Sequence, residues 1–186
     1  MDESEPDPRT APHTYVLAVT LVAATELEPV RQAMLALRAP GQRKLHWHTE
    51  SARRRAAIVD RIASLPIRHV AVVRDGLPGE QPERRRRKCL ARMAWELDQR
   101  GVTRLVAESR EAKQNGRDLA VFGYLRANGT VGSTLRIFHQ PGPCEPALWI
   151  ADCVAGAVSA ARSGKADHLS TLRDTVTAVR ITADSG

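Results

Sequence analysis

The sequence predicts an α/β fold in which a mixed β-sheet is flanked by helices. The chain has 186 residues, which is about the size of one domain. Apolar residues make up 42% of it, enough to fill one hydrophobic core. Short β-branched runs alternate with longer segments of helical periodicity, as in α/β proteins. We therefore expect a single domain over residues 1–186, in which residues 1–13 are mobile and residues 165–186 form a peripheral segment.

Local signals mark where the predicted elements begin and end. Thr25 and Glu28 have the spacing of a capping box at the start of the first helix. Pro82 starts the third helix, and Gly101 follows it as a C-cap. Each strand is an apolar, β-branched run between turn residues. In chain order we predict a strand at 14–23, helices at 25–37 and 51–65, a strand at 67–74, a helix at 82–100, a strand at 103–109, a helix at 118–127, a strand at 133–139, a helix at 145–162, and a helix plus an edge strand within 165–186.

Composition and the absence of common motifs exclude several classes of protein. The longest apolar run, residues 15–24, is half the length of a membrane span, and the acidic N-terminus does not resemble a secretory signal. We therefore expect a cytoplasmic protein with no membrane partner. The three cysteines form no CxxC pair, which indicates reduced thiols. Phosphate-binding loop, GxGxxG, HExxH and GxSxG motifs are missing. The net charge of +7 favours a polyanionic partner.

Acidic residues at three places could form a site. Asp152 interrupts an apolar helix and shares a face with Leu148, while Gly156 in the same helix requires a packing reason. Such a carboxylate needs a partner if it is buried, although it could instead lie at the edge of the apolar face. Glu108 ends a strand, where α/β sheets form their sites, or it simply faces water. Asp2 belongs by composition to a frayed acidic tail.

These acids occur in an order that resembles the domain of unknown function 3800 family. The resemblance covers the DES opening at residues 2–4, the Lys44-Leu-His46 element, Glu108, and the closing helix with Asp152. It implies an RNase-H-like fold, and Asp2, Glu108 and Asp152 as carboxylate ligands of Mg²⁺ or Mn²⁺. Lys44 and His46 would then contact the scissile phosphate or transfer protons.

The chain departs from the family pattern at its first strand. The strand that normally precedes the DES is reduced to Met1, and Glu5 replaces a glycine. Either translation begins upstream of Met1 or the first strand is truncated. A truncated strand would place Asp2 near the other two acids but hold it weakly, because one or two ladder bonds do not offset the entropy of ordering the backbone.

Basic clusters supply a separate indication of a nucleic-acid partner. They lie at the starts of two predicted helices, where positive charge opposes the helix dipole and an anion would relieve it. A solvated arginine-rich face is the alternative. The candidate nucleic-acid-binding residues are Arg53, Arg54, Arg55, Arg84, Arg85, Arg86, Arg87 and Lys88.

A second metal site and a second function also remain open. His46, His48 and Glu50 would lie on one side of an extended segment, with a spacing that Zn²⁺ or Mn²⁺ could use, or the segment could be a rim whose Trp47 packs inward. Taken together, the sequence favours a nuclease that uses carboxylate-bound divalent metal ions to hydrolyse the phosphodiester bonds of RNA or DNA. A non-catalytic module that binds nucleic acid or protein on the same fold is the alternative.

Overall fold

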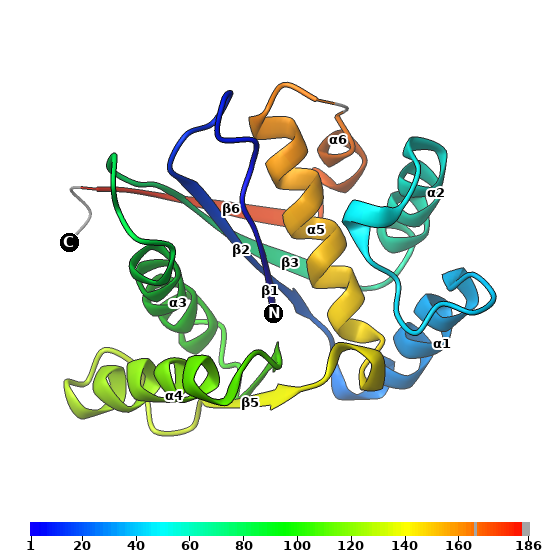
Figure 1. Cartoon of the computed structure of the whole chain (residues 1–186). Coiled ribbons are helices and arrows are strands. Elements are labelled where there is room, and N and C mark those ends of the chain that lie inside the picture. Colours follow the sequence, from blue (N-terminus) through cyan, green and yellow to red (C-terminus); the bar gives the residue numbers. More distant parts are fainter. Residues whose placement is uncertain (166, 184–186) are drawn as a thin grey trace.

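A four-stranded mixed sheet and a two-stranded parallel sheet form the centre of the computed structural model, which describes residues 1–165 and 167–183 (Figure 1). One sheet has the order β1-β2-β3-β6, with antiparallel pairs except for the parallel pair β3·β6. The other is the parallel pair β4·β5. The strands are β1 Asp2–Ser4, β2 Thr14–Leu21, β3 Arg68–Asp75, β4 Arg104–Glu108, β5 Arg136–Gln140 and β6 Val176–Thr182.

Met1 joins the two sheets. Its amino group donates a hydrogen bond to the Val106 carbonyl at 2.7 Å, and the Glu108 amide donates to the Met1 carbonyl at 3.1 Å. This pattern is a parallel bridge opposite Ala107. The side chain of Met1 is 4% exposed and packs in the core. Backbone pairing on two sides and the burial of Met1 thus place residues 1–4 in the sheet, where composition alone suggested a tail.

Helices cover both faces of the sheet. The helices are α1 Leu27–Leu37, α2 Ala52–Ala63, α3 Pro82–Asp98, α4 Ala112–Ala127, α5 Ala147–Arg162 and α6 Leu169–Leu172, with short 3-10 turns at Ala24–Glu26, Trp47–Thr49 and Gly142–Cys144. Alternate residues of β2 face opposite layers: Val16 and Ala18 pack with α1, α2 and α5, while Leu17 and Val19 pack with α3 and α4. This arrangement confirms the predicted α/β class with a mixed sheet flanked by helices.

Two predicted helix starts differ from the structure. Thr25 lies inside a 3-10 turn, and α1 begins at Leu27 without a side-chain cap. The capping box is instead found at α4, where Glu111 and Gln114 bond reciprocally to each other's backbone, so this helix begins six residues before the predicted Asp118. The predicted C-terminal helix and edge strand correspond to α6 and β6, while residues 166 and 184–186 of that segment lie outside the described residues.

The cysteines and the helix lengths give two further results. Cys89, Cys144 and Cys153 are free thiols, and the first and last of these are buried. Within residues 1–165 and 167–183, no helix combines the length and the apolar character needed to cross a bilayer.

Candidate active site

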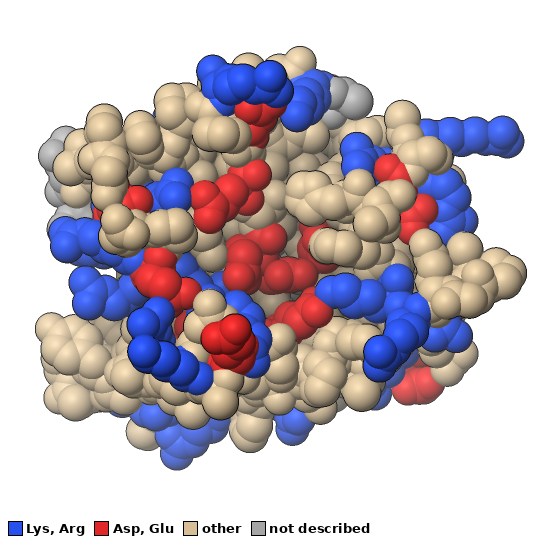
Figure 2. All heavy atoms as spheres, viewed as in Figure 1, with Lys and Arg blue, Asp and Glu red and all other residues tan. Residues whose placement is uncertain are grey.

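All five residues predicted to be catalytic line one small hollow. The hollow has a volume of about 200 Å³ and lies where β1, β4 and α5 meet the segment before α2. Figure 2 shows acidic side chains gathered at the centre of this face, with basic side chains around them. The lining residues are Asp2, Glu3, Lys44, His46, His48, Glu108, Ser109, Arg110 and Asp152.

Glu108 reaches the hollow from the carboxyl end of β4. Its amide is paired with Met1, and the side chain lies against the backbone of Gly142 in the turn after β5. A Cβ atom on Gly142 would approach the Glu108 carboxylate closer than 3.0 Å. Gly142 therefore leaves the space that the Glu108 carboxylate occupies, and the position of this acid depends on the absence of a side chain there.

Asp152 is a buried carboxylate and not a surface acid at the edge of α5. It is 4% exposed, and its Oδ2 accepts a hydrogen bond from the Trp47 amide at 2.9 Å and lies 2.8 Å from His46 Nδ1. Gly156, one turn further along α5, lies against the Trp47 ring so closely that any Cβ would overlap it. The packing reason for this mid-helix glycine is thus the close approach of Trp47, which places its amide on Asp152.

The segment that contains Lys44 and His46 supplies the positive groups of the hollow. Lys44 Nζ lies 2.5 Å from Glu108 Oε1, and His46 pairs with Asp152. Trp47 anchors the segment, since its side chain is 2% exposed in the core. Arg55 fixes the same turn by donating to the Trp47 carbonyl at 2.9 Å and by stacking on the Trp47 ring. The segment therefore packs Trp47 inward, as the alternative interpretation expected, and also brings Lys44 and His46 into the hollow.

Asp2 has a pKa far above its usual range. Burial raises the pKa of Asp2 to about 7, and the negative charges of Asp152, Glu3 and Glu108 add to the shift. The Glu3 amide donates to Asp2 Oδ1 at 2.9 Å, which opposes the shift. Burial is therefore the main reason that Asp2 holds its proton, and the charges of Asp152 and Glu108 act in the same direction.

A network of buried ion pairs supports the hollow from the α3 and α4 side. Arg86 is 3% exposed at its side chain; it contacts Glu3 and donates two hydrogen bonds to Asp118, one of them at 2.8 Å. Arg110 bonds to Asp118 at 3.2 Å, and these arginines hold the pKa of Asp118 below its usual range, against the opposing effect of its burial. Sequence reasoning missed Glu3, Asp118 and Arg110, because their pairing depends on tertiary contacts that leave no local pattern.

The predicted nucleic-acid-binding residues divide into exposed and structural groups. In the α3 cluster, Arg85 pairs with Glu5 at 3.0 Å and is buried like Arg86, so these two do not contribute to an exposed basic surface. Near α2, Arg54 and Arg55 bond to backbone carbonyls of neighbouring segments. Among the predicted residues, Arg53, Arg84 and Arg87 are exposed, and Lys88 is half-buried like Arg54 and Arg55.

The alternative metal site at His46, His48 and Glu50 does not form. Residues 47–49 are a 3-10 turn and not an extended strand. Glu50 does not line the hollow; it is 8% exposed and pairs with Arg54 at 2.9 Å. Across the described residues, no group of three or more His, Cys, Asp or Glu side chains lies ready to hold a metal ion.

The three acids nevertheless have the chemistry of a magnesium site. They offer carboxylate oxygens, which Mg²⁺ prefers, and Mg²⁺ commonly takes only one or two protein carboxylates together with water and substrate phosphate. Lys44 and His46 now contact two of these carboxylates and would compete with a metal ion for them. A comparison of the chain with family models, with curated proteins and with solved structures gave no match.

Proposed function

We propose that the protein is a divalent-metal-dependent nuclease of RNase-H-like type. The observation that supports this most directly is the convergence of Asp2, Glu108 and Asp152, from β1, β4 and α5, in one polar hollow beside Lys44 and His46. Asp2 is far from Glu108 and Asp152 in the sequence, so tertiary structure brings the three acids together. The mixed sheet, with acids at strand ends and on a helix packed across it, supports the RNase-H-like interpretation.

The carboxylates would hold Mg²⁺ or Mn²⁺, and such ions, when bound, activate water and neutralise the charge that develops on a phosphodiester. The Trp47 amide orients Asp152 for this role, and Gly142 leaves the space that the Glu108 carboxylate needs. The ion pair between Arg86 and Glu3 keeps β1, which bears Asp2, close to α3. Preorganised ligands of this kind reduce the cost of forming a metal site.

Lys44 and His46 would act on the substrate. Lys44 is 24% exposed at its side chain, so its ammonium can reach a phosphate oxygen at the mouth of the hollow. His46 is 43% exposed; because its Nδ1 faces Asp152, its Nε2 is the atom available to give a proton to a leaving oxygen or take one from water. The carboxylate fixes the orientation of the imidazole ring.

A non-catalytic nucleic-acid-binding module is the second candidate. It is favoured by the absence, in the described part of the chain, of a group of acids already arranged around a metal position. In that case Lys44 and His46 would serve as permanent partners of Glu108 and Asp152, and the more accessible basic residues would bind the phosphate backbone without cleavage.

A cleavage assay distinguishes the two candidates. The intact protein is incubated with single-stranded RNA, single-stranded DNA and an RNA–DNA hybrid, with Mg²⁺ or Mn²⁺ and with chelator. We expect metal-dependent cleavage of at least one substrate, which Asp152→Asn and Glu108→Gln reduce by at least 100-fold. Asp60→Asn, on the exposed face of α2, is the matched control and retains activity.

Folding and binding measurements complete the test. Circular dichroism shows whether each variant is folded, and fluorescence anisotropy measures its affinity for the same substrates. Binding without cleavage by the intact protein under every metal condition would refute the nuclease proposal and support the binding module. Cleavage that persists in folded Asp152→Asn would refute the assignment of this residue.

A further inference from the structure

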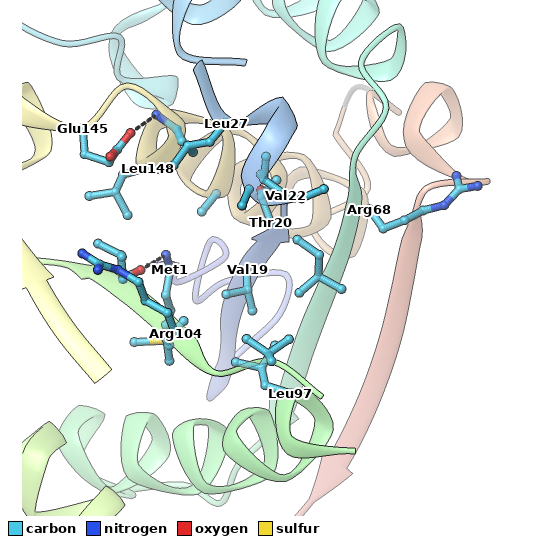
Figure 3. A pocket seen from close by; sticks show the side chains of 18 of the residues that line it. Met1, Val19, Thr20, Val22, Leu27, Arg68, Leu97, Arg104, Glu145 and Leu148 are labelled. Carbon is cyan, nitrogen blue, oxygen red and sulfur yellow. Dashed lines mark hydrogen bonds between the residues drawn. The ribbon is translucent and has the colours of Figure 1, made fainter. Parts of the chain in front are cut away.

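A groove between α3 and α4 lies outside the carboxylate hollow. It has a volume of about 790 Å³ and shares no lining residue with the hollow. Residues from the first half of α3 and from the second half of α4 line it. It is also distinct from the cavity between β2 and β4 in Figure 3, which α3 borders only through Leu97 near its C-terminal end. The groove therefore uses the side of α3 on which the basic cluster lies.

Positive charge predominates in the groove. Its lining includes five basic residues and two acidic ones. Both acids are neutralised within the protein, because Asp118 pairs with Arg86 and Arg110, and Glu83 accepts a hydrogen bond from Arg110 at 2.8 Å. The acids of the groove thus leave its other basic side chains available to a ligand.

Both walls of the groove contribute such side chains. On α3, Arg87 is exposed and Lys88 is half-buried, and neither has a carboxylate partner among the residues that the structure describes. On α4, the exposed Arg117 lies 3.4 Å from Glu83, which it shares with Arg110. Cations that face one groove from two helices attract a ligand with several negative charges, such as a phosphate backbone.

An aromatic ring and apolar side chains complete the groove. Ala91 and Val121 line it and pack against the core beneath. Tyr124 is 68% exposed, and its ring stacks on no aromatic or cationic side chain of the described residues. It lies about 10 Å along α4 from Arg117 at a rise of 1.5 Å per residue. A free ring beside cations offers a base a surface on which to stack while the adjoining phosphates are neutralised.

Ion pairs join the groove to the carboxylate hollow. Arg110 lines the hollow and donates to Glu83 in the groove. Arg86, in the groove, contacts Glu3 of the hollow and bonds to Asp118 at 2.8 Å. In Figure 2, basic side chains lie on the side of the hollow where Figure 1 places α3 and α4. A strand that reaches the hollow can therefore continue into the groove over adjoining surface.

We propose that this groove binds single-stranded nucleic acid, with phosphates at Arg87, Lys88 and Arg117 and one base stacked on Tyr124. The inference deepens the proposed function and rests on it, since the bound strand is the substrate that the hollow would cleave. A duplex should bind more weakly, because its bases are already stacked on one another and do not reach the ring. An acidic peptide supplies the charge but has no base for Tyr124.

Fluorescence anisotropy tests the stacking step, with labelled RNA and DNA decamers of mixed sequence, in chelator so that nothing is cleaved. The better-binding decamer is compared with its abasic counterpart and with its duplex. Intact protein should bind the decamer at least about fivefold more tightly than either of these. Tyr124→Ala should lose that preference over the abasic strand and leave the affinity for the abasic strand unchanged, whereas Tyr124→Phe should keep the preference. Leu119→Ala, exposed on α4 outside the groove, is the control and should behave as the intact protein.

Salt titration of the same complexes tests the phosphate contacts. Joint replacement of Arg87 and Lys88 by glutamine should lower the salt slope by about 0.7 per lost contact, for the decamer and the abasic strand alike. Lys113→Gln, an exposed lysine of α4 outside the groove, should leave the slope unchanged. A glutamate decamer should bind at least tenfold more weakly than the nucleic acid.

Three results would overturn the proposal. One is no binding of either decamer, and another is a folded Tyr124→Ala variant that keeps the full preference for the base-bearing strand. The third is a glutamate decamer or a duplex that binds as tightly as the single strand. These outcomes are separate from the cleavage test: binding that depends on Tyr124 without cleavage under any metal condition would refute the nuclease alone, and metal-dependent cleavage with binding that does not depend on Tyr124 would refute the groove alone.

Discussion

Replacing Asp2 with asparagine should stabilise the protein at neutral pH and leave it unchanged in acid. The folded pKa of Asp2 is about 7, against 3.8 for the unperturbed group, because burial and the neighbouring acids disfavour its charge. A raised folded pKa means that Asp2 holds its proton more tightly in the folded state than in the unfolded state. The contribution of this group to the free energy of unfolding is therefore fully present below pH ~4 and is lost as the pH rises to about 7. A difference of about three pH units corresponds to about 4 kcal/mol.

The structure allows this substitution without loss of packing. Asparagine keeps the Oδ1 atom that accepts the Glu3 amide and removes only the charge. Solvent reaches part of the hollow and screens the repulsion, so we expect Asp2→Asn to gain about 2 to 4 kcal/mol at pH 8. That gain corresponds to a rise in Tm of about 5 to 15 °C for a chain of this length.

Thermal unfolding of the intact protein and of Asp2→Asn, followed by circular dichroism from pH 4 to pH 8, measures the effect. Asp60→Asn is the control, and its Tm should track the intact protein at every pH. A gain for Asp2→Asn that is the same at pH 4 and pH 8, or a loss at pH 8, would refute the argument that burial and the neighbouring acids disfavour the charge of Asp2.

Three further predictions test other parts of the structure. Gly156→Ala should destabilise the protein by about 1 to 3 kcal/mol, because its Cβ overlaps the Trp47 ring, whereas Gly123→Ala on α4 meets nothing within 4 Å and should stabilise by up to about 1 kcal/mol; chemical denaturation compares the two. Burial lowers the pKa of His69 to about 4, so the protein should lose about 3 kcal/mol between pH 6.5 and pH 4 as the unfolded state takes up the proton, and His69→Gln should remove this loss in acid titrations. The more accessible basic side chains at the start of α3 are Arg84, Arg87 and Lys88. Their exchange for glutamine should weaken nucleic-acid binding equally across sequences and lower the slope of its salt dependence by about 0.9 per lost phosphate contact on duplex DNA. An unchanged slope would mean that these side chains are solvated and contact no phosphate.

Those parts of the site that depend on local pattern could be predicted from the sequence. A carboxylate inside an apolar helix, as at Asp152, must find a partner, and a mid-helix glycine such as Gly156 must have a packing reason. A strand end, as at Glu108, is where an α/β sheet presents its polar groups. The two acids also occur in the order of the family resemblance, and both line the hollow.

Features that depend on pairing between distant elements could not be predicted. The charge run at the start of α3 looks uniform in the sequence, yet Arg85 and Arg86 are buried because Glu5, Glu3 and Asp118 come from other elements. The same holds for the N-terminus, whose composition suggests a mobile tail but whose backbone pairs with β2 and β4. Composition reports how a segment behaves in water, and it does not report which edges are free to pair with it.

The central claim is that Asp2, Glu108 and Asp152 hold a divalent metal ion. Calorimetric titration of the intact protein with Mn²⁺ and with Mg²⁺ at pH 7.5 tests it most directly, with Asp152→Asn and the Asp60→Asn control measured in parallel. We predict saturable binding by the intact protein and by Asp60→Asn, and a loss of at least tenfold in affinity for Asp152→Asn in its folded form. No saturable binding to the intact protein, or equal affinity in folded Asp152→Asn, would contradict the claim.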